Sequence, residues 1–195
     1  MAFESIINRG EFFSNHYLDA VIGGDLGDLR GRWDERERRD MPTARTRVRT
    51  LGSKFFQARG RAAEASGLDR AAGVRPLNEA VLEAFGFPAE RTIVEFERTG
   101  VETLTVPVTH QVETGTGLLL VVIEAGFATD VDQIFDDEFG NPAHLLESLW
   151  RETLSFPEPA AAVGEIFAVD EPPRFVVVIA GTLLLLAERA ERALD

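Results

Sequence analysis

Residues 118–125 read LLLVVIEA, a nearly continuous apolar run that closes on one carboxylate, Glu124, and one alanine. A short apolar run between turn residues is typical of a strand that is buried on both faces. We therefore expect this run to be the central strand of a sheet covered by helices. A carboxylate that emerges from such a strand is also a placement that binds a divalent cation. A strand-end residue that already faces water is the alternative reading of Glu124.

Segments with strand-like and helical periodicity surround this run. Alternating polar and apolar residues predict two further strands, 92–97 and 102–108, and the apolar runs 175–179 and 183–187 predict two more. The last two flank Ala180-Gly181-Thr182 and therefore predict a β-hairpin. Helical periodicity predicts two helices, over 77–85 and 143–154, whereas 157–173 is expected to be loop-rich. This order predicts an α+β (α/β-like) fold, with a mixed central sheet flanked by helices over residues 76–195.

The first 72 residues have helical periodicity and predict a helical subdomain, 1–72, in front of that core. Ser14 is the expected N-cap of the first helix, which Gly23-Gly24 would end. Asp25 would then cap the second helix. Pro42-Thr43 is expected to begin the third.

Charge also divides the chain. Residues 1–75 carry 14 basic and 11 acidic side chains, whereas residues 76–195 carry 6 and 22. A contact with a nucleic-acid backbone would therefore use the N-terminal part. The candidate residues are basic positions of the third helix: Arg45, Arg47, Arg49 and Lys54. A solvated helix face held by salt bridges accounts for the same residues, and the net charge of −13 argues against a dedicated DNA-binding protein.

No complete catalytic or cofactor motif can be assembled from these residues, so we expect no cofactor and no self-sufficient enzyme. The sequence has no cysteine, which excludes disulfides, thiolate nucleophiles and cysteine-type zinc sites. Its three histidines lack metal-binding spacing, and neither a nucleophile elbow nor a phosphate-binding glycine loop is present. The sequence starts without a signal-peptide pattern, and no apolar run is long enough to span a bilayer. We therefore expect a cytoplasmic protein without a membrane partner.

Two segments resemble one protein family. Residues 10–33, GEFFSNHYLDAVIGGDLGDLRGRW, resemble the extreme N-terminal region of type IIG-like restriction–modification adenine methylases and their relatives in DISARM-type phage-defence systems. Residues 172–189, PPRFVVVIAGTLLLLAER, resemble the hairpin that precedes the helical and methylase regions of the same proteins. The resemblance implies that the chain corresponds to the front of such an enzyme. Its partner would then be a methylase domain or another subunit of a defence system.

The resemblance also implies a restriction-endonuclease-like fold of the PD-(D/E)xK type. The active form of that fold uses an Asp on one strand and Glu-x-Lys on the next to hold Mg²⁺ and activate water. Here Glu-x-Lys falls on Glu124-Ala125-Gly126, so glycine replaces the lysine, and no lysine follows Lys54. The preceding strand offers only Glu102. The resemblance therefore predicts a nuclease-like domain that has lost cleavage activity.

Three functions stay open at this point. The leading hypothesis is a non-catalytic accessory domain that binds DNA or a partner subunit for a DNA methylase of a restriction–modification or phage-defence system. The second is a metal-dependent DNA nuclease whose Mg²⁺ site is rearranged around Glu83, Glu102 and Glu124. The third is an acidic adaptor or DNA mimic that docks on a basic protein surface.

Overall fold

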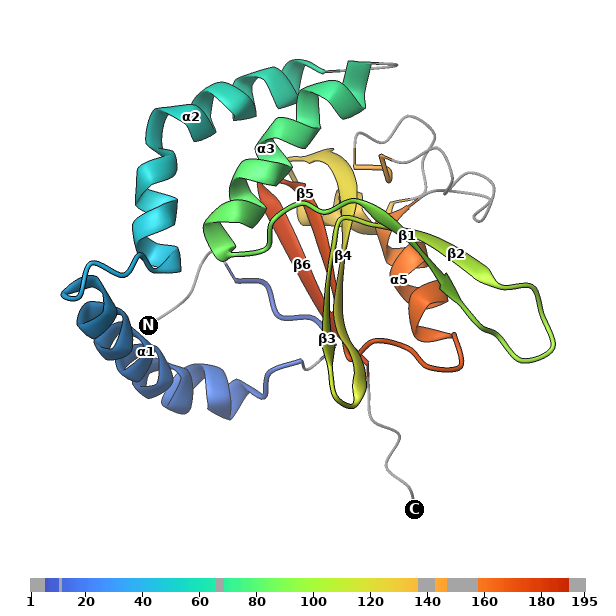
Figure 1. Cartoon of the computed structure of the whole chain (residues 1–195), viewed down its shortest axis with the longest axis horizontal. Helices are drawn as coiled ribbons and strands as arrows, with labels where there is room; N and C mark the ends of the chain where they lie inside the picture. Colours follow the sequence, from blue (N-terminus) through green and yellow to red (C-terminus); the bar gives the residue numbers. More distant parts are fainter. Residues whose placement is uncertain (1–5, 11, 66–68, 137–142, 147–157, 190–195) are drawn as a thin grey trace. The chain divides into compact units, whose positions relative to one another are not determined.

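The computed structural model describes residues 6–10, 12–65, 69–136, 143–146 and 158–189 (Figure 1). The helices are η1 (Tyr17–Val21), α1 (Ile22–Glu37), α2 (Ala44–Glu64), α3 (Arg70–Phe85), η3 (Val131–Phe135) and α5 (Pro159–Phe167). The strands are β1 (Thr92–Phe96), β2 (Leu104–Val108), β3 (His110–Thr114), β4 (Gly117–Ala128), β5 (Phe175–Gly181) and β6 (Leu183–Glu188). The fold is α+β, as predicted.

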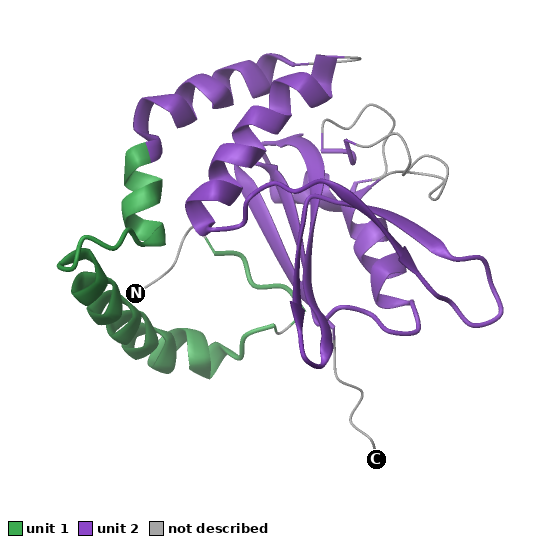
Figure 2. Ribbon diagram, in the orientation of Figure 1, with its two compact units in different colours: residues 1–50 green, residues 51–195 purple. Residues whose placement is uncertain are grey.

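The chain divides into two compact units, residues 1–50 and 51–195 (Figure 2). The division falls inside α2, close to Gly52, whose φ of 37° and ψ of −121° interrupt the helical geometry. The limit expected from the sequence, between 72 and 76, lies instead within α3 of the second unit. None of the helices described here has the length and apolarity that crossing a bilayer demands.

The first unit is helical. Ser14 Oγ accepts a hydrogen bond from the Tyr17 N–H at 3.1 Å, which confirms Ser14 as a cap. The predicted helix end at Gly23-Gly24 is wrong, because both glycines lie inside α1. A glycine inside a helix costs about 1 kcal/mol relative to alanine but still donates its backbone hydrogen bond. Asp25 is consequently no cap, and its carboxylate accepts a hydrogen bond from the Tyr17 hydroxyl at 2.9 Å.

The second unit contains a four-stranded sheet in the order β3-β4-β5-β6. The β4–β5 pair is parallel and the other two pairs are antiparallel, so the sheet is mixed, as expected. Strand β4 is the predicted central strand and is buried from Val121 to Ala128. The predicted hairpin is formed by β5 and β6. Strand β3 is not predicted, because its sequence has no clear periodicity. Strands β1 and β2 pair with each other in a separate two-stranded sheet.

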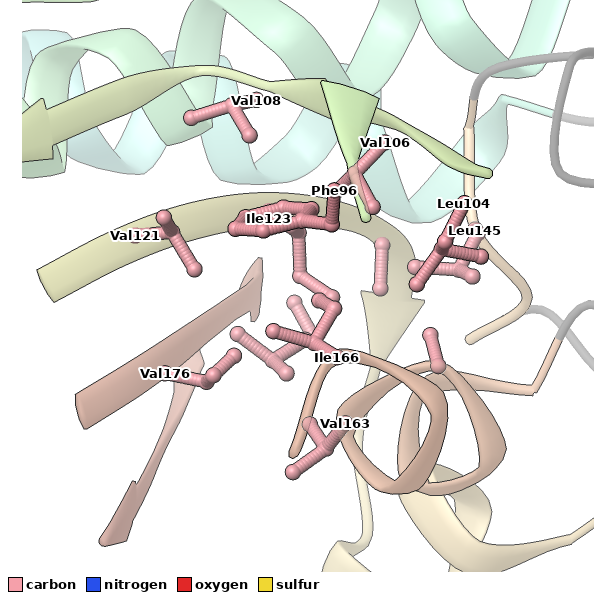
Figure 3. Close-up of a cluster of buried hydrophobic side chains, with 14 of the residues drawn as sticks. Phe96, Leu104, Val106, Val108, Val121, Ile123, Leu145, Val163, Ile166 and Val176 are labelled. Atoms are coloured by element: carbon pink, nitrogen blue, oxygen red, sulfur yellow. The ribbon is translucent and has the colours of Figure 1, made fainter. Parts of the chain in front are cut away.

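The two faces of the four-stranded sheet are covered by different elements. Val121 and Ile123 belong to a core shared with α5 and with the β1–β2 hairpin, and Figure 3 shows Ile166 of α5 within this core. Val122 packs against Leu82 of α3. Side chains alternate between the faces of a strand. Glu124, two residues after Val122, therefore lies on the face that α3 covers.

Three predictions about helices differ from the structure. Helix α3 begins at Arg70, seven residues before the expected start, and contains Pro76 in its interior. The expected loop over 157–173 contains α5, whose Pro159 occupies a first-turn position that proline favours. The expected helix over 143–154 is wrong over residues 143–146, where Leu145 forms a bridge with Ala125. Residues 147–154 lie outside the described part of the chain.

Candidate functional site

Glu124 marks the point where β4 and β5 separate. The parallel ladder pairs Glu124 with Ile179, but the next pair joins Ala128 to Gly181, so β4 contains two extra residues. Such a bulge interrupts the ladder and leaves backbone groups that need other partners. Residues 143–146 supply some of them, because Leu145 pairs with the bulged part of β4. The candidate site around Glu124 therefore lies where the central strands β4 and β5 separate.

Asn78 of α3 spans this opening. Its Nδ2 donates to Glu124 Oε1 at 3.2 Å and lies 3.5 Å from the Ala125 carbonyl oxygen. Its Oδ1 accepts a hydrogen bond from the Gly181 N–H at 3.1 Å. Asn78 is completely buried, and its amide contacts β4 and the end of β5 at the same time. One side chain thus replaces the ladder hydrogen bonds that the bulge interrupts.

Arg91, in the connection from α3 to β1, binds the Glu124 carboxylate with two hydrogen bonds. Arg91 Nε lies 2.9 Å from Glu124 Oε2, and Nη2 lies 3.2 Å from Oε1. Arg91 Nη1 also donates to Glu79 Oε1 at 2.7 Å, and Arg75 Nε lies 3.9 Å from Glu124 Oε2. Bidentate pairing is the strong mode of arginine–carboxylate contact. We call these residues the Glu124 network: Arg75, Asn78, Glu79, Arg91 and Glu124.

The Glu124 network balances its own charge, with two guanidinium groups and two carboxylates. Burial acts most strongly on the pKa of Arg91 and lowers it, but hydrogen bonds with Glu124 and Glu79 outweigh burial and raise that pKa above its usual value. Arg91 therefore stays protonated and cannot exchange a proton with a reacting group. The Glu124 side chain is 2% exposed and that of Arg91 is 32% exposed, so water reaches the guanidinium side of the pair.

The Glu124 network does not fit Mg²⁺ in its present arrangement. Mg²⁺ takes carboxylate and water oxygens in octahedral geometry, whereas both oxygens of Glu124 already accept hydrogen bonds from Arg91. Glu83 is exposed on α3, and Glu102 is exposed in the turn before β2 rather than on the strand. Within the described ranges, no group of three or more His, Asp and Glu side chains is placed to hold a metal ion. The three predicted acidic residues are thus not gathered into one site.

Arg45, one of the predicted nucleic-acid-binding residues, is engaged by carboxylates of its own unit. Its Nη2 lies 2.5 Å from Asp34 Oδ1 and 2.6 Å from Glu37 Oε2. Glu37 also accepts hydrogen bonds from the hydroxyls of Thr43 and Thr46. The hydrogen bond from Arg45, followed by those from the two threonines, lowers the pKa of Glu37 from 4.5 to about 2. Salt bridging of a helix face thus accounts for Arg45.

The other predicted basic residues differ in their surroundings. Arg47 donates from Nη1 to the Pro42 carbonyl at 3.4 Å, and Arg49 is exposed. Lys54 is exposed too, but it follows the Gly52 kink and belongs to the second unit. The four residues therefore do not form one patch within either unit.

Sequence reasoning identified Glu124 but missed the residues that hold it. A signal for three members of the network is present, because Arg75, Asn78 and Glu79 stand at i, i+3 and i+4 and share one helix face. Val74, Leu77 and Leu82 of the same helix are buried, so these polar residues interrupt an apolar surface. Arg91 has no comparable signal, since it lies outside any periodic segment.

No protein-family model, curated protein or solved structure matches this chain. We therefore infer its function from its own residues.

Proposed function

We propose that this chain is a non-catalytic accessory domain that serves a DNA methylase of a restriction–modification or phage-defence system. In this proposal its second unit is a restriction-endonuclease-like core, and Glu124 takes the position of the nuclease Glu-x-Lys glutamate. The observation that supports the loss of catalysis is the pairing of Glu124 with Arg91 through both carboxylate oxygens. A guanidinium thus lies where an active nuclease would need a metal ion.

Phosphodiester cleavage requires an activated water and stabilisation of the developing negative charge. Gly126 stands in place of the lysine, and Arg91 cannot act as a proton acceptor because it stays charged. Glu124 is buried beneath α3 and Arg91, with a side chain that is 2% exposed. It therefore lacks both a neighbouring lysine and contact with the water that the reaction needs. Binding is the activity that remains for such a domain.

A protein partner is better supported than DNA. Arg45, the first of the predicted phosphate-binding residues, already has its charge compensated by Asp34 and Glu37. The acidic excess after residue 75 would also repel phosphate groups. We therefore propose the methylase domain or another defence-system subunit as the partner. A secondary DNA contact would use Arg47 and Arg49 of the first unit.

Incubation of the full chain with plasmid DNA and Mg²⁺ or Mn²⁺ tests the loss of catalysis. We expect no nicking or linearisation with either ion. Cleavage that disappears in Glu124→Gln, while Glu95→Gln retains it, would contradict the proposal. The second variant is the matched control, since Glu95 is an exposed carboxylate of β1 outside the candidate sites.

Co-purification tests the partner. When the tagged chain is isolated from its own cells, a partner that transfers a methyl group to adenine in DNA should co-purify with it. Retention of duplex DNA at low salt tests the alternative. Binding lost in Arg47→Glu/Arg49→Glu but kept in Arg59→Glu/Arg61→Glu would favour DNA over a protein partner.

One observation favours a metal-dependent nuclease as the second candidate. Glu79 and Glu124 bind the same guanidinium, so two carboxylates already surround one cation. Arg91→Ala removes that cation and leaves both carboxylates open to a metal ion. We expect this variant to remain inactive on DNA even where Mn²⁺ binding is detected by electron paramagnetic resonance. Mn²⁺-dependent cleavage by Arg91→Ala would favour a nuclease held in an inactive state.

A further inference from the structure

We propose that α2 exchanges between the kinked form of this structure and a continuous helix, with Gly52 as the hinge. The proposal goes beyond the accessory function, because it depends on neither DNA nor a methylase. Three observations support it: the dihedral angles of Gly52, an apolar pattern that crosses this residue, and the different contacts of the two halves of α2.

The backbone of α2 leaves helical geometry at Gly52. Its φ of 37° and ψ of −121° differ from the values of about −63° and −42° that an α-helix requires. Glycine adopts a positive φ readily, whereas residues with a side chain rarely do. A side chain would nonetheless have room, because a Cβ atom added at Gly52 meets no atom of the described residues within 4 Å beyond its own stretch of helix. The kink therefore depends on the conformational freedom of glycine and not on crowding around it.

The sequence of α2 has the pattern of a continuous helix. Apolar residues recur at alternate spacings of four and three: Ala44, Val48, Leu51, Phe55, Ala58 and Ala62. This spacing places all of them on one face of an uninterrupted helix. The kink divides that face between Leu51 and Phe55, and Val48 before it is 44% exposed whereas Ala62 after it is 1% exposed. The pattern thus favours a continuous α2 over the kinked one.

The two halves of α2 are held by different elements. Before the kink, Arg45 donates a hydrogen bond to Glu37 of α1 at 2.6 Å. After the kink, Ala62 lies in a buried cluster with Val74 of α3. The limit between the two compact units falls between residues 50 and 51. A change in the two dihedral angles of Gly52 can therefore straighten α2 while each half keeps its own contacts, which is how a hinge residue acts.

The two forms differ in the surface that α2 presents. In a continuous α2, Arg47, Lys54 and Arg61 stand at intervals of seven residues and share one face. The kink takes Arg47 out of this row. A ligand that binds one form more tightly than the other shifts the exchange towards that form. Gly52 is thus a point at which binding to α2 can be regulated.

A metal clamp measures how much of the continuous form is present. Histidines four residues apart on a helix face each other and can bind one Ni²⁺ ion together. Arg49→His/Ser53→His places such a pair across Gly52, and Gln57→His/Arg61→His places one across Gly60. The second pair is the matched control, because Gly60 has the same position within its pair but keeps helical geometry. All four replaced residues are exposed.

We expect the pair across Gly52 to bind Ni²⁺ more weakly than the control pair, because only the continuous fraction of α2 can bind it. Gly52→Ala should bring the two affinities together, since a positive φ is costly for alanine and alanine favours the helix. Gly60→Ala should leave the affinity of the first pair unchanged. Equal affinities of the two pairs in the chain that retains Gly52 would overturn the proposal, as would a first pair that Gly52→Ala leaves weak.

Distances between spin labels test the exchange itself. The chain has no cysteine, so Arg49→Cys/Ala63→Cys gives two unique labelling positions, both at exposed residues. Their Cα atoms lie about 21 Å apart in a continuous helix and closer together in a kinked one. We expect double electron–electron resonance to show two separations. Gly52→Ala should raise the ratio of the continuous to the kinked form at least about tenfold, whereas Gly60→Ala should not change it. A single separation in the chain that retains Gly52, or equal responses to the two substitutions, would overturn the proposal.

Discussion

Two glutamates of this chain, one in each unit, are held by an arginine, but their surroundings differ. Glu124 lies under α3 with a side chain that is 2% exposed, and Arg91 and Asn78 complete its hydrogen bonds. Glu37 is 25% exposed and shares Arg45 with the more exposed Asp34. Water can solvate Glu37 when its partner is lost, whereas it cannot reach Glu124. The same kind of ion pair, arginine with glutamate, therefore stabilises a buried site at Glu124 and makes only a modest surface contact at Glu37.

The largest expected effect is that of Arg91→Ala. This change leaves the buried Glu124 carboxylate without its bidentate partner, and loss of one member of a buried pair costs about 3–5 kcal/mol. We expect a loss of about 3 kcal/mol, at the lower end of that range, because 32% of the Arg91 side chain is exposed. Urea unfolding of the full chain measures the change in free energy of unfolding.

Arg98→Ala is the control for this comparison. Arg98 pairs with Glu165 at 2.8 Å, and both side chains are partly exposed, at 23% and 42%. A surface ion pair of this kind contributes about 0–1 kcal/mol. If Arg98→Ala destabilises the chain as much as Arg91→Ala, burial does not distinguish the two pairs and the comparison fails.

A smaller effect is expected from Asn78→Ala. The change removes the amide that serves Glu124 and the Gly181 N–H, and leaving buried polar groups unsatisfied costs about 1–3 kcal/mol. The effect should be local, so the Gly181 amide proton should exchange with solvent faster than in the unchanged chain. Hydrogen exchange followed by NMR measures this rate. Thr99→Ala is the control, because its hydroxyl bonds Asp170 at an exposed position. Unchanged exchange at Gly181 would show that Asn78 does not hold the end of β5.

The contrast between local and distant information explains what could be predicted from the sequence. The central strand β4 and the β5–β6 hairpin follow from apolar runs and a turn within a few residues of each other. The prolines around residue 159 predict a loop, whereas helix α5 begins at Pro159, because proline suits the first turn of a helix. Likewise, local preference alone predicts a helix end at Gly23-Gly24, but α1 continues through both glycines.

The Glu124 network could not be assembled from local patterns. Asn78 and Glu124 are 46 residues apart, and Asn78 and Gly181 are 103 residues apart. Their contact depends on which face of the sheet α3 covers and on the bulge in β4, and neither follows from periodicity. The sequence therefore singles out the Glu124 carboxylate but not the arginine that neutralises it. Its expected place at a strand end facing water is wrong, because β4 continues to Ala128 and the Glu124 side chain is 2% exposed.

The smallest expected effect lies in the first unit and concerns the acid titration of Glu37. Its pKa is lowered from 4.5 to about 2 in the folded chain, first by the hydrogen bond from Arg45 and then by those from Thr43 and Thr46. A carboxyl group with a lowered folded pKa stabilises the fold above its usual pKa, and this contribution is lost as the pH falls. The stability difference between the unchanged chain and Glu37→Gln should thus be constant above pH 4.5 and shrink between pH 4.5 and about 2. Thermal unfolding followed by circular dichroism measures that difference.

NMR of the Glu37 side-chain carboxyl separates the causes of this shift. The titration midpoint should lie near 2 in the unchanged chain. Arg45→Gln removes the largest cause and should move the midpoint furthest towards 4.5, whereas Thr46→Val removes a smaller one and should move it less. A larger response to Thr46→Val would mean that hydroxyl donors, rather than the guanidinium, hold the charge of Glu37. The exposed site would then depend chiefly on neutral hydrogen bonds, and its likeness to the arginine-held Glu124 would be lost.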